Sequence, residues 1–300
     1  MSLYLLGPLI KQRREELGYS QEELANGICS VPTLSRIENG ERLPNKQHSE
    51  MLLQRLGYSD SIIINYVDEK TLKLHELKYS IRHAVMCNQL RAARSLLEKI
   101  VSMSSCEDAI SQQFILLYQT ILSDSKSNQE KLDAFLTALR FTCPKLNPTA
   151  LPLILSYEEI ILLNGIAVCQ AESGQLEHGI SLLYQLKMYY ERHMVNQEET
   201  LRTQLLVLYN LSKYLGKAER YDECIEICDL GIRISRETRK CTQLDKLLYN
   251  KAWAMLKRGR EQDAVLAKDC LQKAINMADA LEQTAFKQHY LQFMNESFKE

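Results

Sequence analysis

The sequence has almost no net charge and no long apolar run, and its N-terminal residues lack the pattern of a signal peptide. It carries 37 Lys and Arg against 38 Asp and Glu in 300 residues, which excludes a highly basic nucleic-acid coat and an acidic disordered tail. No uninterrupted apolar run approaches the ~18 residues of a membrane-spanning helix, and the N-terminus lacks a charged region followed by a small-residue cleavage site. We therefore expect a globular cytoplasmic protein without a membrane segment.

Motifs of nucleotide and metal chemistry are missing as well. None of the 11 glycines forms a Gly-x-Gly pair, which excludes a dinucleotide fingerprint and a phosphate-binding loop. The six histidines show no His-Glu-x-x-His pattern, and the nine scattered cysteines suit a reducing cytosol. Cys224 and Cys228 lie one helical turn apart, without the second pair that zinc sites usually need. We expect no cofactor, no metal and no enzymatic activity.

Proline is absent from the last 148 residues, because all six prolines lie in the first 152. Such an absence is expected of long helices joined by tight turns. From about residue 70 onward the apolar positions follow helical periodicity in segments of roughly 12 to 20 residues, whereas residues 1–65 hold short segments separated by glycines. The sequence predicts an all-α fold with two domains, residues 1–67 and 68–300.

Local signals in the first domain predict short helices around a tight turn. A first helix spans Leu9 to Leu17. Ser20-Gln-Glu-Glu23 is a capping-box pattern that begins a second helix at residue 21, and Asn26-Gly27 ends that helix in the left-handed conformation. Pro32 belongs in the first turn of a third helix, which ends at Gly40. We expect a five-helix domain with this helical pair at its centre.

A pair of this kind can place its second helix in the DNA major groove while the first braces it across the backbone. The predicted buried seam consists of Leu24, Ala25, Ile28, Leu34 and Ile37. Outward-facing side chains then contact bases and phosphates, with an arginine suited to guanine and a threonine to a thymine methyl. The predicted DNA-binding residues are Gln21, Ser30, Pro32, Thr33, Arg36, Arg42 and Lys46. The alternative is a hairpin that binds no DNA, because residues 1–65 hold seven basic and eight acidic side chains.

The string Ser20-Gln-Glu-Glu-Leu-Ala, continued by Leu34-Ser-Arg-Ile-Glu-Asn-Gly40, resembles the phage-repressor-like (XRE/Cro-type) helix-turn-helix family. The resemblance covers nearly the whole segment. The turn Asn26-Gly-Ile-Cys-Ser-Val31 is one residue shorter than the commonest form of the family. It is similar to the turn of peptide-pheromone-responsive regulators of the PlcR and Rgg type. This difference leaves the base-reading register of the third helix open.

The remaining chain repeats pairs of helices, with the period near 34 to 45 residues that is typical of tetratricopeptide-like solenoids. The repeat is clearest in Tyr209–Gly231, where small residues fall at the positions of close helix approach: Ser212, Cys224, Cys228 and Gly231. Units before and after it follow the same pattern, and weaker pairs precede them at 72–103 and 107–142. The sequence predicts a right-handed solenoid of about five repeats with a capping helix at 283–298.

Tyr209-Asn210 recurs as Tyr249-Asn250 forty residues on, at the same place on the first helix of a repeat. A side-chain amide pairs with a peptide's C=O and N–H whatever the ligand's sequence. Helices about 8–10 Å apart, and an advance of about 3.3 Å per peptide residue, suit a ligand of about five to eight residues. The predicted peptide-binding residues are Asn164, Tyr209, Asn210, Lys213, Lys217, Tyr249, Asn250, Trp253 and Lys257. The alternative is solvated asparagines and aromatic rings that pack between repeats.

Together, the two domains resemble the peptide-pheromone (quorum-sensing) transcription regulators of Gram-positive bacteria over essentially the full length. The resemblance implies a homodimer that binds a double-stranded DNA operator and a short signalling peptide on the concave surface of the repeats. Peptide binding then alters the placement of the two DNA-reading heads. The alternative is an adaptor or antitoxin-like protein whose repeats hold a protein partner and which also touches DNA.

Overall fold

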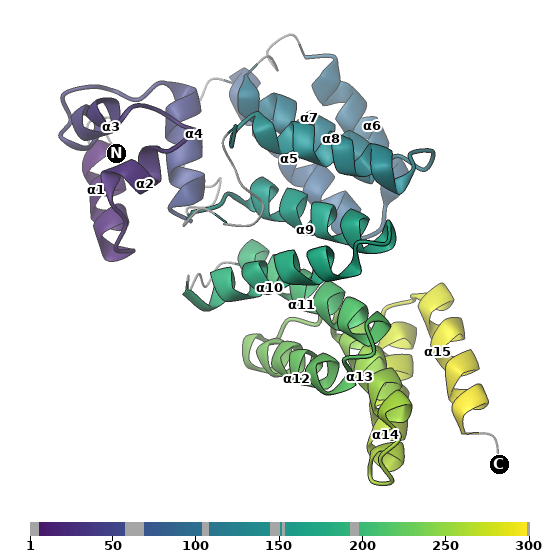
Figure 1. Ribbon diagram of the computed structural model, residues 1–300. Coiled ribbons are helices and arrows are strands. Elements are labelled where there is room, and N and C mark those ends of the chain that lie inside the picture. The colour runs from purple at the N-terminus through teal and green to yellow at the C-terminus, as the bar shows by residue number, and fades with distance from the viewer. Residues whose placement is uncertain are drawn as a thin grey trace. The chain divides into compact units, whose positions relative to one another are not determined.

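The computed structural model describes residues 6–57, 69–103, 108–144, 151, 154–192 and 198–298. Every regular element among these residues is an α-helix (Figure 1), as the sequence predicts. The chain forms two compact units, Met1–Cys169 and Gln170–Glu300, and their boundary falls inside α9 (Tyr157–Glu172). The first unit thus contains the predicted N-terminal domain together with the first helical pairs. The predicted boundary after residue 67 lies outside the described residues.

Four helices form the N-terminal head: α1 (Leu6–Glu16), α2 (Gln21–Ala25), α3 (Val31–Glu38) and α4 (Lys46–Arg55). The local signals predicted α2 and α3 at these places. The capping box at α2 is present, because the Glu23 N–H donates to Ser20 Oγ (3.2 Å) and the Ser20 N–H donates to the Glu23 carboxylate (2.6 Å). Gly27 follows α2 with φ +75°, and Pro32 lies in the first turn of α3. The expected fifth helix would fall outside the described residues.

Four of the five residues of the predicted seam are in the core of the head, since Leu24, Ala25, Leu34 and Ile37 are at most 1% exposed, whereas Ile28 is partly buried and packs against them. One contribution comes from outside the head, because Ile154 belongs to the same buried cluster. The first helix starts at Leu6, three residues before its predicted start, and includes Gly7. A Cβ at Gly7 would lie 1.9 Å from the carbonyl oxygen of Ile37, so only glycine lets α1 approach α3 this closely.

Antiparallel pairs follow the head in the first unit, and their ranges match the two predicted pairs: α5 (Glu69–Met86) with α6 (Leu90–Val101), and α7 (Ala109–Ile121) with α8 (Asn128–Arg140). The helix α9 follows them. On the second helices of these pairs, Ala93, Ile100 and Ala138 are fully buried, whereas Phe141, which follows α8, is 37% exposed. These pairs therefore use small and branched residues at the helix contacts, as the repeat pattern predicts.

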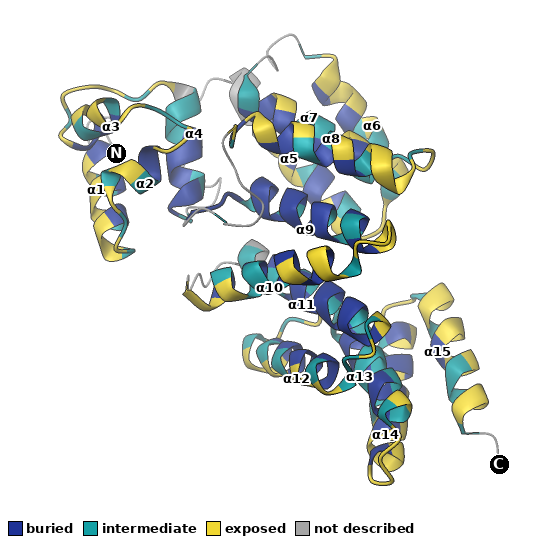
Figure 2. Cartoon of the chain, viewed as in Figure 1, coloured by how far each residue is buried: buried dark blue, intermediate teal, exposed yellow. Residues whose placement is uncertain are grey.

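The second unit continues the pattern with α10 (Leu176–Arg192), α11 (Glu198–Lys217), α12 (Tyr221–Thr238), α13 (Leu244–Arg258) and α14 (Asp263–Ala280). Ser212, Cys224 and Cys228 are at most 1% exposed, which confirms the predicted close approach of α11 and α12. The predicted capping helix is α15 (Thr284–Ser297). Figure 2 shows that α15 is exposed along much of its length, and Tyr290 is its buried side chain.

No helix in the described ranges is long and apolar enough to cross a membrane.

Candidate functional site

The outward face of α3 carries the predicted base-reading residues. Pro32 and Arg36 are exposed and Thr33 is partly exposed, while the opposite face of the helix is buried in the head. Ser30 caps α3, since its Oγ accepts from the Thr33 N–H (3.3 Å) and lies 2.9 Å from Thr33 Oγ1. Val31, at the first position of α3, is 38% exposed and was not predicted. The outer face of α3 therefore exposes both polar and apolar side chains to solvent.

Two arginines near this face have no side-chain partner within the described part of the chain. Arg36 and Arg42 are both exposed, and the turn after α3 brings them together, because the Arg42 N–H donates to the Arg36 carbonyl oxygen (3.1 Å). Lys46 begins α4, but its side chain lies outside the described set. Both guanidinium groups are thus free to contact a polyanion, although the head as a whole has no net positive charge.

A buried network fixes α3 from behind. Glu38 is 2% exposed and accepts from Arg14 at both carboxylate oxygens, 2.6 Å from Nε and 2.9 Å from Nη2. The hydrogen bond with Glu38 raises the pKa of Arg14 above its ordinary value. Gln21 Nε2 donates to the same carboxylate (2.7 Å). An amide carries two N–H donors, and Gln21 uses one of them in this bond. Sequence reasoning missed this network, because its members are far apart in the chain.

The turn between α2 and α3 is held by Arg55 at the end of α4, and both the turn and Arg55 contact residues beyond the head. Arg55 Nη1 donates to the carbonyl oxygen of Asn26, and its Nη2 lies 3.7 Å from Glu159 Oε1 on α9. Both side chains are buried, at 4% and 1% exposure. A Cβ at Gly27 would lie 2.5 Å from the carbonyl oxygen of Thr142, after α8. The head and the following helices therefore share one packed interface inside the first unit.

Glu159 accepts several hydrogen bonds at this interface, from Thr142 Oγ1 (2.7 Å), Cys143 Sγ (3.0 Å) and the Ser156 N–H (2.7 Å). Burial alone would raise the pKa of Glu159, but the Arg55 charge and these hydrogen bonds hold it below its ordinary value. Burial and the Glu159 charge raise the pKa of Cys143, which keeps it a protonated donor. The carboxylate therefore stays charged inside the fold.

Six of the predicted peptide-binding residues form a partly or fully exposed row on α11 and α13: Tyr209, Lys213, Lys217, Tyr249, Trp253 and Lys257. The predicted amides are placed differently. Asn210 and, in the first unit, Asn164 are each 7% exposed, so both are largely enclosed in the helix packing. Asn250 is half-buried, and its Nδ2 donates to Ser212 Oγ (2.9 Å).

The two lysines on α11 share one carboxylate. Lys213 Nζ and Lys217 Nζ each lie 2.8 Å from an oxygen of Glu172, and Tyr214 Oη donates to the same carboxylate (2.9 Å). Burial works to raise the pKa of Glu172, but the bonds from Lys213, Lys217 and Tyr214 lower it to about 2. Glu172 is thus a built-in counter-ion at the place where sequence reasoning expected a peptide carboxylate.

The aromatic members of the row pack on neighbouring helices. Trp253 meets Tyr221 edge-on at a centroid distance of 5.8 Å, and a Cβ at Gly216 would lie 3.0 Å from the indole ring. Tyr249 stacks on Tyr290 of α15 at 4.8 Å. The capping helix therefore covers part of the predicted row, and the rings take part in packing between repeats.

No group of three or more His, Cys, Asp or Glu side chains that could hold a metal ion occurs in the described ranges. A helix-turn-helix head followed by paired helices defines the chain as a helix-turn-helix protein with a helical-repeat domain. Residues 10–63 match the helix-turn-helix family, and residues 82–295 match the RNPP family C-terminal domain. The chain therefore belongs to the RNPP family.

Solved structures share this fold. PlcR from Bacillus thuringiensis, in complex with the peptide PapR7 and DNA, is 21% identical with a TM-score of 0.64, covering 95% of this chain and 98% of that chain. The apo form of PlcR is 20% identical with a TM-score of 0.60, covering 96% and 98%. ComR from Streptococcus vestibularis, in complex with its signalling peptide XIP, is 14% identical with a TM-score of 0.54, covering 97% of both chains. No curated protein matches the chain by sequence.

Proposed function

We propose that this protein is a transcriptional regulator that reads double-stranded operator DNA with α3 and binds a short signalling peptide with its C-terminal repeats, and that peptide binding changes its affinity for DNA. The observation that carries the proposal is the contrast between the two sides of α3. Glu38 on its buried side is fixed by Arg14 and Gln21, while Arg36 on its outer side has no side-chain partner in the described chain. A rigid helix with an uncommitted arginine is suited to base recognition.

The DNA-reading roles follow from exposure. Arg36 forks onto guanine, and Thr33, Pro32 and Val31 contact neighbouring base edges and methyl groups from the first turn of α3. Arg42 and Lys46 contact phosphates, together with Ser30 and the second amide donor of Gln21. A homodimer with two heads one helical turn apart, about 34 Å, doubles these contacts and offsets the weak attraction of one neutral head.

The peptide site uses the exposed row of α11 and α13. Lys213, Lys217 and Lys257 supply cations, and Trp253 supplies an aromatic surface for an apolar ligand side chain. The amides of Asn210 and Asn250 pair with the ligand backbone after rotating away from the helix packing. PlcR and ComR, which share this fold, have been solved with the peptides PapR7 and XIP. The proposed role is regulatory and cytoplasmic, with no catalytic step.

A selection experiment on the purified full-length protein tests both activities. Duplexes with a random central segment are selected for binding, and random heptapeptides that the protein retains are identified by mass spectrometry. We expect a palindromic duplex and a related set of peptides. Arg36→Ala should weaken the enrichment of that duplex and relax its sequence, and it should leave the peptide set unchanged. A stoichiometric polypeptide that co-purifies with the protein, together with no peptide enrichment, would instead support the adaptor function.

A further inference from the structure

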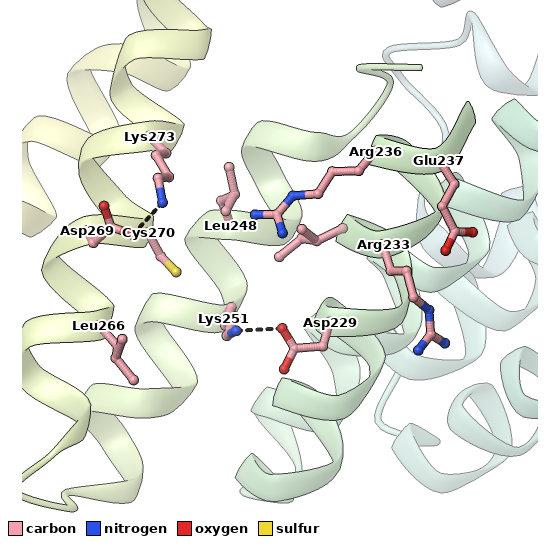
Figure 3. Close-up of a pocket in the computed structure, with 11 residues that line it drawn as sticks. Asp229, Arg233, Arg236, Glu237, Leu248, Lys251, Leu266, Asp269, Cys270 and Lys273 are labelled. Carbon is pink, nitrogen blue, oxygen red and sulfur yellow. Dashed lines mark hydrogen bonds and ion pairs between the residues drawn. The ribbon is translucent and has the colours of Figure 1, made fainter. Parts of the chain in front are cut away.

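A groove of about 600 Å³ in the second unit is lined by side chains from three helices, α12, α13 and α14 (Figure 3). Leu248 and Lys251 are its contributions from α13. Successive residues of a helix are rotated by about 100°, so these two side chains lie on the side of α13 opposite to Trp253 and Lys257. The groove is therefore separate from the proposed peptide row.

Apolar side chains form the base of the groove. Ile232 from α12 and Leu248 from α13 are each 5% exposed and belong to the helix packing. Leu266 from α14 lines the groove and is 53% exposed, so about half of its surface has no cover. The thiol of Cys270 lines the same wall (Figure 3). An apolar segment of a ligand would find contacts on all three helices.

Two of the four cations of the groove are neutralised inside it. Lys251 Nζ lies 2.5 Å from Asp229 Oδ1, and Lys273 Nζ lies 2.5 Å from Asp269 Oδ2. These two pairs leave the groove with balanced charge near α13 and α14. The positive charge that remains comes from α12.

Arg233 and Arg236 on α12 are exposed, and within the described chain neither side chain has a hydrogen-bond or ion-pair partner. In Figure 3 the guanidinium group of Arg236 extends toward Leu248. On α12, Asp229 is paired with Lys251, so Glu237 is the remaining acidic side chain that lines the groove. The two arginines and Glu237 together leave one net positive charge. Arginine forks pair with carboxylate and phosphate oxygens in bidentate geometry.

We propose that this groove binds an amphipathic organic anion, with its carboxylate or phosphate headgroup on Arg236, its apolar tail over Leu266 and Leu248, and Arg233 adding positive charge from the same helix. Pockets for small ligands commonly span about 300–1,000 Å³ and combine apolar walls with a few placed polar groups, as this groove does. The site lies outside both surfaces of the proposed function, so it does not depend on DNA or peptide binding.

Three probes with the same ten-carbon tail test the charge requirement: undecanoate, decyl phosphate and decyltrimethylammonium, each added to the full-length protein as monomers. Calorimetry reports affinity, and alkylation by iodoacetamide, followed by peptide mass spectrometry, reports occupancy at Cys270. Burial raises the pKa of Cys270, so its alkylation is slow and is followed for longer than that of the exposed Cys87 and Cys241. We expect at least one anion to bind once per chain and to slow alkylation of Cys270 at least fivefold, with no change at the two exposed thiols.

Substitutions separate the groove from general apolar binding. The double variant Arg233→Ala and Arg236→Ala should weaken binding of the anion at least fivefold, and Leu266→Ser should weaken it as well. Arg192→Ala on α10 removes another exposed arginine and should leave the affinity unchanged. Circular dichroism verifies that each variant is folded. Equal binding of the cationic probe, binding without protection of Cys270, or no binding of either anion would overturn the proposal.

Discussion

Arg55 and Glu159 form a buried ion pair that joins the last described helix of the head to the first turn of α9. The same arginine donates to the carbonyl oxygen of Asn26, in the turn that positions α3. The placement of the proposed reading helix thus depends on a charge supplied from outside the head. Because both groups are buried, the loss of either one leaves the other charge unpaired in the interior.

Glu159→Gln removes the charge that balances Arg55. Breaking a buried ion pair by removing one partner commonly costs about 3–5 kcal/mol, and we expect a loss of unfolding free energy in this range. Urea denaturation of the full-length protein measures it. Glu98→Gln, at an exposed position of α6, is the matched control and should change the stability little. Similar effects of the two substitutions would contradict the assigned role of the ion pair.

The same pair predicts a pH dependence. The pKa of Glu159 in the folded protein is held below its ordinary value of 4.5. A carboxyl group with a lowered folded pKa contributes stability above its unfolded pKa and loses this contribution as the pH falls through the folded pKa. The stability difference between the native protein and Glu159→Gln should therefore be constant above about pH 5.5 and shrink below the unfolded pKa. A difference that grows on acidification would be inconsistent with the assigned charge state.

Much of the head could be predicted because its signals are local. The reciprocal bonds of Ser20 and Glu23, the left-handed conformation of Gly27 and the position of Pro32 in α3 each depend on neighbouring residues alone. Helical periodicity and the recurrence of small residues likewise predicted the helix pairs of both units. Such patterns survive in a single sequence, because each repeat meets the same packing requirement.

The remaining features depend on residues that are distant in the chain. Nothing near Gly7 indicates that it will meet Ile37, and nothing near Arg55 indicates Glu159 as its partner. In the candidate peptide site, Lys213 resembled a free cation because its counter-ion Glu172 lies on another helix. Periodicity placed Asn210 on the correct helix. Successive residues point about 100° apart around a helix, so an error of one position in the repeat decides whether an amide is exposed or buried.

Gly7→Ala should destabilise the head. The added methyl group would meet a backbone carbonyl at 1.9 Å, and overpacking of this kind typically costs about 1–3 kcal/mol. The comparison is Gly231→Ala, where the added group meets the tip of the Leu247 side chain at 2.7 Å. A side chain can rotate more easily than a helix backbone can shift. Thermal unfolding should therefore show the larger loss for Gly7→Ala, and the reverse order would contradict the tight contact of α1 with α3.

Arg36→Ala and Arg42→Ala should weaken DNA binding in different ways. Removing the base contact of Arg36 should cost about 1–3 kcal/mol on the selected operator and reduce discrimination against other duplexes. Removing the phosphate contact of Arg42 should weaken binding to all duplexes and reduce the salt slope by about 1. Both side chains are exposed, so stability should not change. Fluorescence anisotropy over a range of salt concentrations distinguishes the two roles, and identical profiles would refute the assignment.

Glu172→Gln should strengthen the binding of peptides that end in a free carboxylate. In the native protein, Lys213 and Lys217 already bind Glu172, so a ligand carboxylate must compete for them. Without this charge the two lysines are available, and we expect a several-fold gain that a C-terminally amidated peptide does not share. Calorimetry with the selected heptapeptide and its amide provides the comparison. Equal gains for both peptides would place the ligand carboxylate elsewhere.

Coupling between the two activities is the central claim, and one titration tests it most directly. The affinity of the full-length protein for its selected duplex is measured by fluorescence anisotropy, with and without a saturating selected heptapeptide. A coupling free energy of about 1–3 kcal/mol corresponds to a change of about 5- to 150-fold. We predict a change within this range, in either direction, that is absent when the heptapeptide is replaced by one of scrambled sequence. The same DNA affinity with and without the bound peptide would contradict the account.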